Sequence, residues 1–102
     1  MLFPIYLESL TVGSLALSPT FDEDVLSYTA SAASSVASAA VTATPAQNGA
    51  EVEITVTAPN GTRKNVVNGQ AAALATGANV IAVTVKNGNA VKVYTVTVTR
   101  AS

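Results

Sequence analysis

The stretch "NVIAVTVKNGNAVKVYTVTVTR" (residues 79–100) decides the fold of this 102-residue chain. Apolar side chains occupy every second position on both sides of Asn87–Gly88, a period of two that is typical of half-buried β-strands. Asparagine and glycine tolerate the positive φ angles that tight hairpin turns require. The stretch therefore predicts an antiparallel hairpin whose inward face carries Ile81, Val83, Val85, Tyr94, Val96 and Val98.

The rest of the chain repeats this combination of alternating residues and turn signals. Further Asn-Gly pairs stand at 48–49, 60–61 and 68–69. The segment "SVASAAVTAT" (35–44) is ambiguous because alanine has the highest helix propensity, but we interpret it as a strand from its later alternation. The other expected strands are a broken one at 6–17, then 25–31, 51–58 and a short one at 69–76. This pattern predicts an all-β, immunoglobulin-like antiparallel β-sandwich of seven to eight short strands.

Composition excludes several classes of function. Only 11% of the residues are charged and the net charge is −1, so the chain lacks the dense positive charge that binds nucleic acid or anionic membranes. It contains no cysteine and no histidine, which excludes disulfides, thiolate metal sites and the usual acid–base residue. The first ten residues, "MLFPIYLESL", have neither a basic segment nor a long apolar run, and we expect neither a signal peptide nor membrane insertion there.

The few charges are ordered along the chain. All six acidic residues precede all five basic residues. Head-to-tail docking between copies is one interpretation of this order. The interpretation that we favour is that the acidic and basic halves meet across the sandwich and neutralise each other.

Three segments of the chain carry recognisable motifs. They are "LSPTFDEDVLSYTA" (17–30), "LATGANVIAVTV" (74–85) and "YTVTVTR" (94–100). In this order they resemble the bacterial cadherin-like β-sandwich domain, a family that carries Leu-Ser-Pro-x-Phe-Asp with a following Ser-Tyr, then Leu-x-x-Gly-x-Asn, then Tyr-Thr-Val-x-Val-x-Arg.

The resemblance implies one immunoglobulin-like domain over residues 7–100. It leaves an N-terminal extension at 1–6 and a C-terminal tail at 101–102. One departure is the stretch "TAPNGTRKN" (57–65), which is longer than the family pattern, so the strand pairing over residues 50–70 stays open.

The resemblance also implies structural roles for single residues. Pro19 would fix the bend before Phe21, and Gly77 would adopt a backbone shape that other residues resist. Tyr94 would bury its ring and direct its hydroxyl to a backbone partner. Together with the alternating residues, the motifs predict a core of Leu17, Phe21, Tyr28, Val41, Ile54, Leu74, Ile81, Val83, Tyr94, Val96 and Val98.

Three groups of polar residues are candidates for chemistry. Asp22 and Asp24 belong to a run of three acids and are weak candidates for metal binding, but calcium needs six to eight oxygens, and we expect a solvated turn instead. Glu51 and Glu53 share a strand face. Paired carboxylates can cleave glycosidic bonds when burial raises the pKa of one of them. We expect both side chains to be solvated instead. Asn60–Gly61–Thr62 matches the N-glycosylation pattern and is interpreted as a turn. We predict no catalytic site and no cofactor.

Thr95, Thr97 and Thr99 form a row of hydroxyls with two interpretations. Flat Thr-x-Thr arrays occur on ice-binding surfaces, but such an array must extend across several flat strands, and sheets twist by about 20° per strand. We therefore expect an ordinary water-facing side of a sheet. Glycan sites usually stack a sugar on exposed aromatic rings. Tyr28 and Tyr94 are assigned to the core and the chain has no tryptophan, so a dedicated sugar site is disfavoured.

The expected function is that of a non-catalytic structural or interaction module, a spacer or display domain of a larger bacterial surface, secreted or phage virion protein. The alternative is an adhesion or carbohydrate-binding module. Expected partners are neighbouring domains of a parent protein and a protein or glycan ligand, with no nucleic acid and no membrane insertion. The expected location is extracellular, at the cell surface or in a virion.

Overall fold

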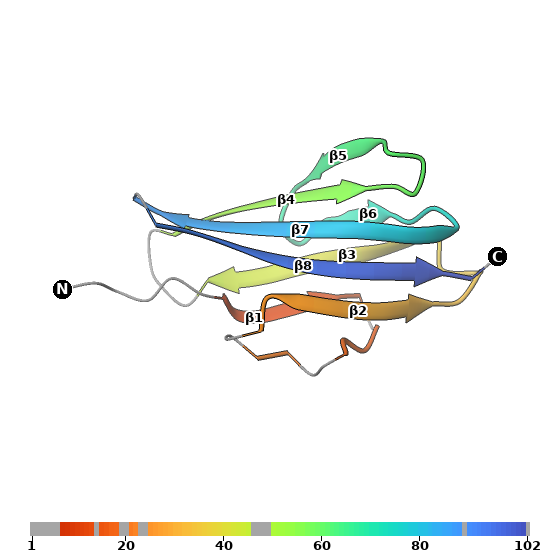
Figure 1. Ribbon diagram of the computed structural model, residues 1–102, viewed down its shortest axis with the longest axis horizontal. Coiled ribbons are helices and arrows are strands. Elements are labelled where there is room, and N and C mark those ends of the chain that lie inside the picture. Colours follow the sequence, from red (N-terminus) through yellow and green to blue (C-terminus); the bar gives the residue numbers. More distant parts are fainter. Residues whose placement is uncertain are drawn as a thin grey trace.

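The computed structural model describes residues 7–13, 15–18, 21–22, 25–45, 50–88 and 90–101. Within these residues the chain forms eight strands and no helix, in two sheets that lie face to face (Figure 1). The strands are β1 (Leu7–Val12), β2 (Ser27–Ala32), β3 (Ser38–Pro45), β4 (Glu51–Thr57), β5 (Arg63–Val66), β6 (Ala71–Ala73), β7 (Gly77–Asn87) and β8 (Ala90–Arg100). The three-stranded sheet has the order β1-β3-β6, and the five-stranded sheet has the order β2-β8-β7-β4-β5. The predicted all-β, immunoglobulin-like sandwich is confirmed.

The predicted C-terminal hairpin is formed by β7 and β8. The two strands pair antiparallel from Gly77 opposite Arg100 to Asn87 opposite Ala90. At eleven residues each they are longer than the short strands that were expected. Because Asn87 still belongs to β7, the connection begins at Gly88, which has a φ of 63°. The turn thus starts one residue later than the Asn87–Gly88 pair predicts.

The pairing of β2 with β8 is parallel, whereas every other strand pair within the described residues is antiparallel. The chain leaves β1 in the three-stranded sheet, crosses to the five-stranded sheet and enters β2 in the same direction as β8. The parallel register runs from Ser27 opposite Thr95 to Ala32 opposite Arg100. As a result β8 lies between β2 and β7 (Figure 1).

The pairing that the sequence leaves open, over residues 50–70, is a second antiparallel hairpin. β4 buries Ile54 and Val56 and pairs on its outer side with β5. The connection is a tight turn in which the Ala58 N–H donates to the Thr62 carbonyl at 2.8 Å. The stretch "TAPNGTRKN" (57–65), which is longer than the family pattern, therefore contains the end of β4, the turn of this hairpin and the start of β5. The predicted strands over 35–44 and 69–76 are confirmed as β3 and β6.

The inner faces of the two sheets share one apolar core. Of the predicted core residues, Leu17 and Phe21 are half-buried against that core and all the others are buried. Phe21 lies outside the strands and stacks on Tyr28, with ring centroids 5.8 Å apart and 25° between the ring planes. In the part of the chain that the structure describes, no helix could cross a membrane.

Gly77 starts β7 with a φ of 106°, the left-handed region that the resemblance implies for it. A Cβ atom at this position would lie 3.2 Å from Cγ of Pro59, a tight contact that would require the proline ring to shift by a few tenths of an ångström. Pro19, to which the resemblance gives the bend before Phe21, lies outside the described residues.

Candidate functional site

Asn79 is the one buried polar or charged residue that the described part of the chain contains. Its Oδ1 accepts a hydrogen bond from the Ala75 N–H at 3.0 Å. Its Nδ2 donates to the carbonyls of Ala75, Gly77 and Val98, at 2.8, 3.1 and 3.2 Å. These bonds fix the bend that precedes β7 and tie it to β8. The sequence does carry a signal for this role, because Asn79 occupies an inward position of the β7 alternation.

The hydroxyls of the two buried tyrosines also bond to backbone groups. Tyr94 Oη accepts from the Leu7 N–H at 3.1 Å, which links β8 to β1 of the opposite sheet and is the kind of partner that the resemblance implies. Tyr28 Oη donates to the Asp22 carbonyl at 2.5 Å and accepts from the Asp22 N–H at 2.9 Å. Burial raises the pKa of Tyr28 above its ordinary value of 10.0, and the hydrogen bond from the Asp22 backbone partly opposes this rise. Neither buried ring offers a face to a sugar.

Arg100, the last residue of the third motif, closes one end of the sandwich. Its Nε and Nη2 donate to the Ser34 carbonyl at 3.2 and 2.7 Å. Its Nη1 donates to the Leu74 carbonyl at 2.9 Å. The guanidinium therefore joins the end of β8 to the β2–β3 loop and to the segment that follows β6. Its role in this structure is to hold backbone segments together.

The weak metal candidates do not form a site that the structure shows. Asp22 is exposed, and Asp24 lies outside the described residues. Across the described ranges, no group of three His, Cys, Asp or Glu residues is placed to hold a metal ion.

One acidic and one basic residue pair within a single sheet, and the expected neutralisation across the sandwich stays a prediction. Glu53 Oε2 lies 3.4 Å from Lys86 Nζ on the neighbouring strand β7, and this is the one ion pair among the residues that the structure describes. Both side chains are about half exposed, so the pair contributes little to stability. Glu51 is also exposed, and neither carboxylate lines the cleft that opens between β5 and β6.

Thr95, Thr97 and Thr99 stand on the outer face of β8 beside a second column of hydroxyls. The parallel register places the outward residues of β2, Ser27, Thr29 and Ser31, directly opposite them. On the other side of β8, the opposite residues of β7 are Ala82, Val80 and Ala78. The hydroxyl-bearing surface therefore spans two neighbouring strands, β2 and β8, whereas the sequence alone indicated only the row on β8. The water-facing role of this surface stays a prediction.

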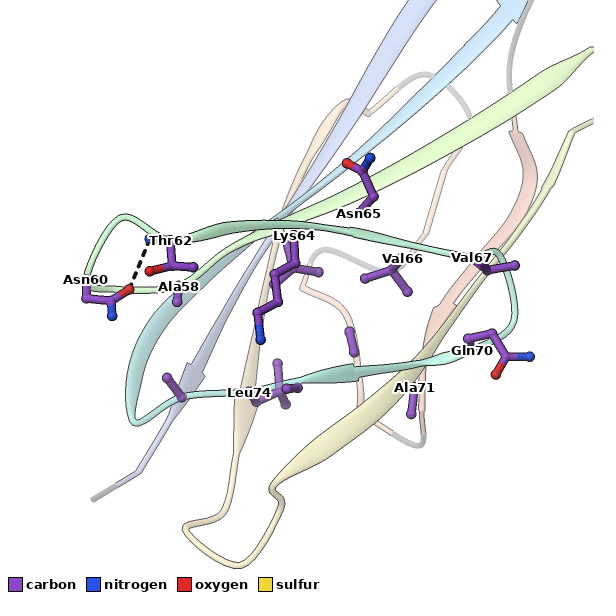
Figure 2. A pocket seen from close by; sticks show the side chains of 14 residues that line it. Ala58, Asn60, Thr62, Lys64, Asn65, Val66, Val67, Gln70, Ala71 and Leu74 are labelled. Carbon is purple, nitrogen blue, oxygen red and sulfur yellow. Dashed lines mark hydrogen bonds between the residues drawn. The ribbon is translucent and has the colours of Figure 1, made fainter.

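A cleft of about 690 Å³ opens between β5 and β6, and we call it the β5–β6 cleft (Figure 2). Its volume is in the range of small-ligand and peptide sites. Most of its lining is aliphatic, with Val56, Val66, Leu74 and the alanines of residues 71–75. Lys64 is the one charged residue among those that line it. No motif in the sequence points to this cleft.

One end of the β5–β6 cleft is closed by the turn at residues 67–70, which carries the chain from β5 to β6. Asn68 docks this turn onto β3 with a reciprocal pair of hydrogen bonds to the Ala43 backbone, at 2.9 Å to Oδ1 and 2.7 Å from Nδ2. The Gly69 N–H adds a bond to the Val41 carbonyl at 2.8 Å. These contacts fasten the turn between β5 and β6 to β3 and so fix this end of the cleft.

The fold and these contacts define a class of protein, an all-β sandwich in which the described motif residues make contacts that hold the fold together. A family model described as "Cadherin-like beta sandwich domain" matches residues 7–101. The chain belongs to the cadherin-like β-sandwich domain family. A comparison with curated proteins gives no match. Domains of this family are typically non-catalytic, act as structural or interaction modules and are generally extracellular.

Proposed function

We propose that this domain is a non-catalytic structural module that spaces, stiffens or displays neighbouring domains of a larger bacterial surface, secreted or phage virion protein. The observation that carries the proposal is the position of β8, the last strand, between β2 and β7. It pairs in parallel with six residues of β2 and antiparallel with eleven residues of β7. A chain that continues beyond β8 is thus anchored on both sides of this strand.

This arrangement resists tension along the strands. A pull on β8 along its axis slides it past both neighbours, and hydrogen bonds that lie across the pull must break together and not one at a time. At the other end of the chain, β1 is paired with β3, and its first N–H is held by Tyr94. The strands follow the 49 Å long axis of the molecule (Figure 1). Tension applied to the ends therefore loads the ladders in shear.

The alternative role, adhesion or carbohydrate binding, has less support. A sugar site needs an exposed aromatic surface. Tyr28 and Tyr94 are buried and bonded to the backbone, while Phe3 and Tyr6 lie outside the described residues. The aliphatic cleft between β5 and β6 contains no aromatic lining residue.

Single-molecule force spectroscopy tests the proposed role. The domain is pulled through its two ends between reference domains, and each unfolding event is recognised by a gain in length of about 3.5 Å per released residue. A second protein is pulled across the five-stranded sheet through Thr29→Cys and Arg63→Cys, which lie on the two edge strands. These are unique attachment points because the chain has no cysteine.

We expect a clearly higher unfolding force for the pull through the ends, because the pull across the sheet separates the ladders one bond at a time. An end-to-end force equal to or below the cross-sheet force would contradict a role in bearing tension between neighbouring domains.

A further inference from the structure

The β5–β6 cleft is bounded on one side by a strand edge that no described strand covers. β6 is the last strand of the three-stranded sheet. The Leu74 N–H donates to the carbonyl of Ala37, directly before β3, at 2.9 Å, and the Gln70 carbonyl accepts from the Val41 N–H of β3 at 3.2 Å. Because backbone direction alternates along a strand, the N–H and C=O groups of Ala71 and Ala73 point to the opposite edge, toward the cleft.

The facing wall has the same property. β5 is the last strand of the five-stranded sheet, and the Thr62 carbonyl that precedes it accepts from the Ala58 N–H, directly after β4, at 2.8 Å. The same alternation turns the backbone groups of Arg63 and Asn65 away from β4. An unpaired strand edge is a template for the addition of another strand. Both long walls therefore offer backbone donors and acceptors to an extended chain.

The lining suits a peptide better than a sugar or a base. The alanines of residues 71–75 leave room along β6, and Val66 and Leu74 provide apolar contacts. Stacking of a sugar or a nucleobase needs an aromatic face, which the lining lacks.

Lys64 gives the cleft a preference in charge. Its register opposite Val56 places it on the inner face of β5, and Figure 2 shows its side chain extending across the cleft toward the segment that contains Leu74. No acidic residue is among those that line the cleft. A lysine that points inward from an edge strand opposes indiscriminate strand pairing. A ligand strand that presents a carboxylate opposite Lys64 neutralises the lysine charge that opposes pairing. Lys64 therefore favours acidic ligand strands over neutral or basic ones.

We propose that the β5–β6 cleft binds an extended acidic peptide segment of a partner protein. The segment adds to the open edge of β6 through Ala71 and Ala73, and its carboxylate faces Lys64. The three-stranded sheet thereby gains a fourth strand. This proposal is independent of the role in bearing tension.

The experiment is an NMR titration of the full ¹⁵N-labelled chain with a capped peptide, Ser-Val-Ser-Asp-Ser-Val-Ser, in which the valines and the aspartate share one face. Two matched peptides carry Asn or Lys in place of Asp. We expect amide shifts and slowed hydrogen exchange at Ala71 and Ala73. At low salt the Asp peptide should bind about two- to fivefold more tightly than the Asn peptide, as for one exposed ion pair.

Four variants locate the interaction. Lys64→Gln should remove the difference between the Asp and Asn peptides, and Lys64→Glu should reverse the preference toward the Lys peptide. Ala73→Pro deletes an N–H that points to the open edge and should abolish binding, whereas Ala73→Ser keeps this N–H and should bind as the wild type does.

Several results would overturn the proposal. They are the absence of shifts at millimolar peptide, equal affinity for the Asp and Asn peptides, and shifts centred on β2 and β8. Shifts of β6 that depend on protein concentration without peptide would assign the cleft to a second copy of the chain. If Ala73→Pro does not fold, the comparison of the three peptides and the two Lys64 variants still tests the proposal.

Discussion

Asn79 shows how a polar side chain becomes part of an apolar core. Its amide makes four hydrogen bonds to backbone groups and leaves no part of the side chain without a partner. An aliphatic residue would fill the same position without making those bonds. Such a residue would leave the backbone groups of Ala75 and Gly77 without these partners, and unpaired polar groups in a protein interior are costly.

We expect Asn79→Ala to lower the free energy of unfolding by about 2–4 kcal/mol. Asn79→Asp should be at least as damaging at pH 7, because its carboxylate would face three carbonyl oxygens. That environment raises the pKa of the aspartate above its unfolded value of about 3.9, so this variant should regain stability as the pH falls from 7 toward 4.

Urea unfolding of both variants measures these effects. The matched control is Asn65→Ala on the exposed face of β5, which should change stability by about 0.5 kcal/mol or less. An Asn79→Ala protein as stable as this control would show that the buried bonds contribute nothing.

Tyr28 should make the domain sensitive to base. Its pKa is raised in the folded state, so the unfolded chain releases the proton first once the pH passes about 10. The stabilisation is complete below that pH and is lost as the pH rises through the folded pKa. Tyr28→Phe should be less stable at pH 8, because it lacks the bonds to Asp22, but its stability should fall less steeply between pH 9 and 11. Urea midpoints of both proteins over this range give the comparison, and parallel curves would refute the prediction.

Among the strands, β2 provides the sharpest test of pairing. The Leu26 carbonyl accepts from the Thr95 N–H of β8 at 2.7 Å, and the Ala32 carbonyl accepts from the Ala101 N–H, directly after β8, at 2.9 Å. Even-numbered residues of β2 therefore direct their backbone groups to β8. Thr29 exchanges hydrogen bonds with Ser18 on the other edge. Neighbouring positions of one strand therefore differ in which edge their N–H faces.

We expect Ala30→Pro to destabilise the domain by about 2–3 kcal/mol, because it removes a donor to β8. Ser31→Pro removes an N–H that points away from β8 and should cost about 1 kcal/mol or less. Ala30→Val adds volume at the buried position while keeping the N–H, and so separates crowding from the lost bond. Thermal or urea unfolding of the three variants measures the order. Equal losses for the two proline variants would contradict the assignment of the Ala30 N–H to the β8 edge and the Ser31 N–H to the opposite edge.

The same strands show what the sequence could and could not predict. β7 and β8 were predictable because each presents an uninterrupted apolar alternation to the core. β5 was not, because "RKNV" (63–66) lies at a sheet edge where its inner face is open and needs no apolar residue at Lys64. The alternation of β2 was visible, but its parallel partner depends on a crossover from β1 that no local pattern encodes. The β5–β6 cleft could not be predicted either, because it depends on where two sheet edges lie in space and no local sequence pattern encodes this.

Taken as a whole molecule, the domain is held together by its core and its ladders and not by charge. Its one described ion pair joins two half-exposed side chains, and the net charge is −1. We expect the free energy of unfolding to change by less than about 0.5 kcal/mol between 0.05 and 1 M sodium chloride, since salt weakens only exposed pairs at this level. Urea unfolding at the two salt concentrations is the measurement, and a large loss at high salt would reveal electrostatic support that the structure does not show.

We infer that β8, held between β2 and β7, is the rigid part of the domain, whereas the facing edges of β5 and β6 are open. Amide hydrogen exchange, measured residue by residue by NMR in low urea, tests both halves at once. The amides of Val83 and Val96 should exchange only through global unfolding, and those of Asn65 and Ala71 should exchange many times faster. Exchange of the β8 amides as fast as those of β5 and β6 would show that β8 is not the rigid part of the domain.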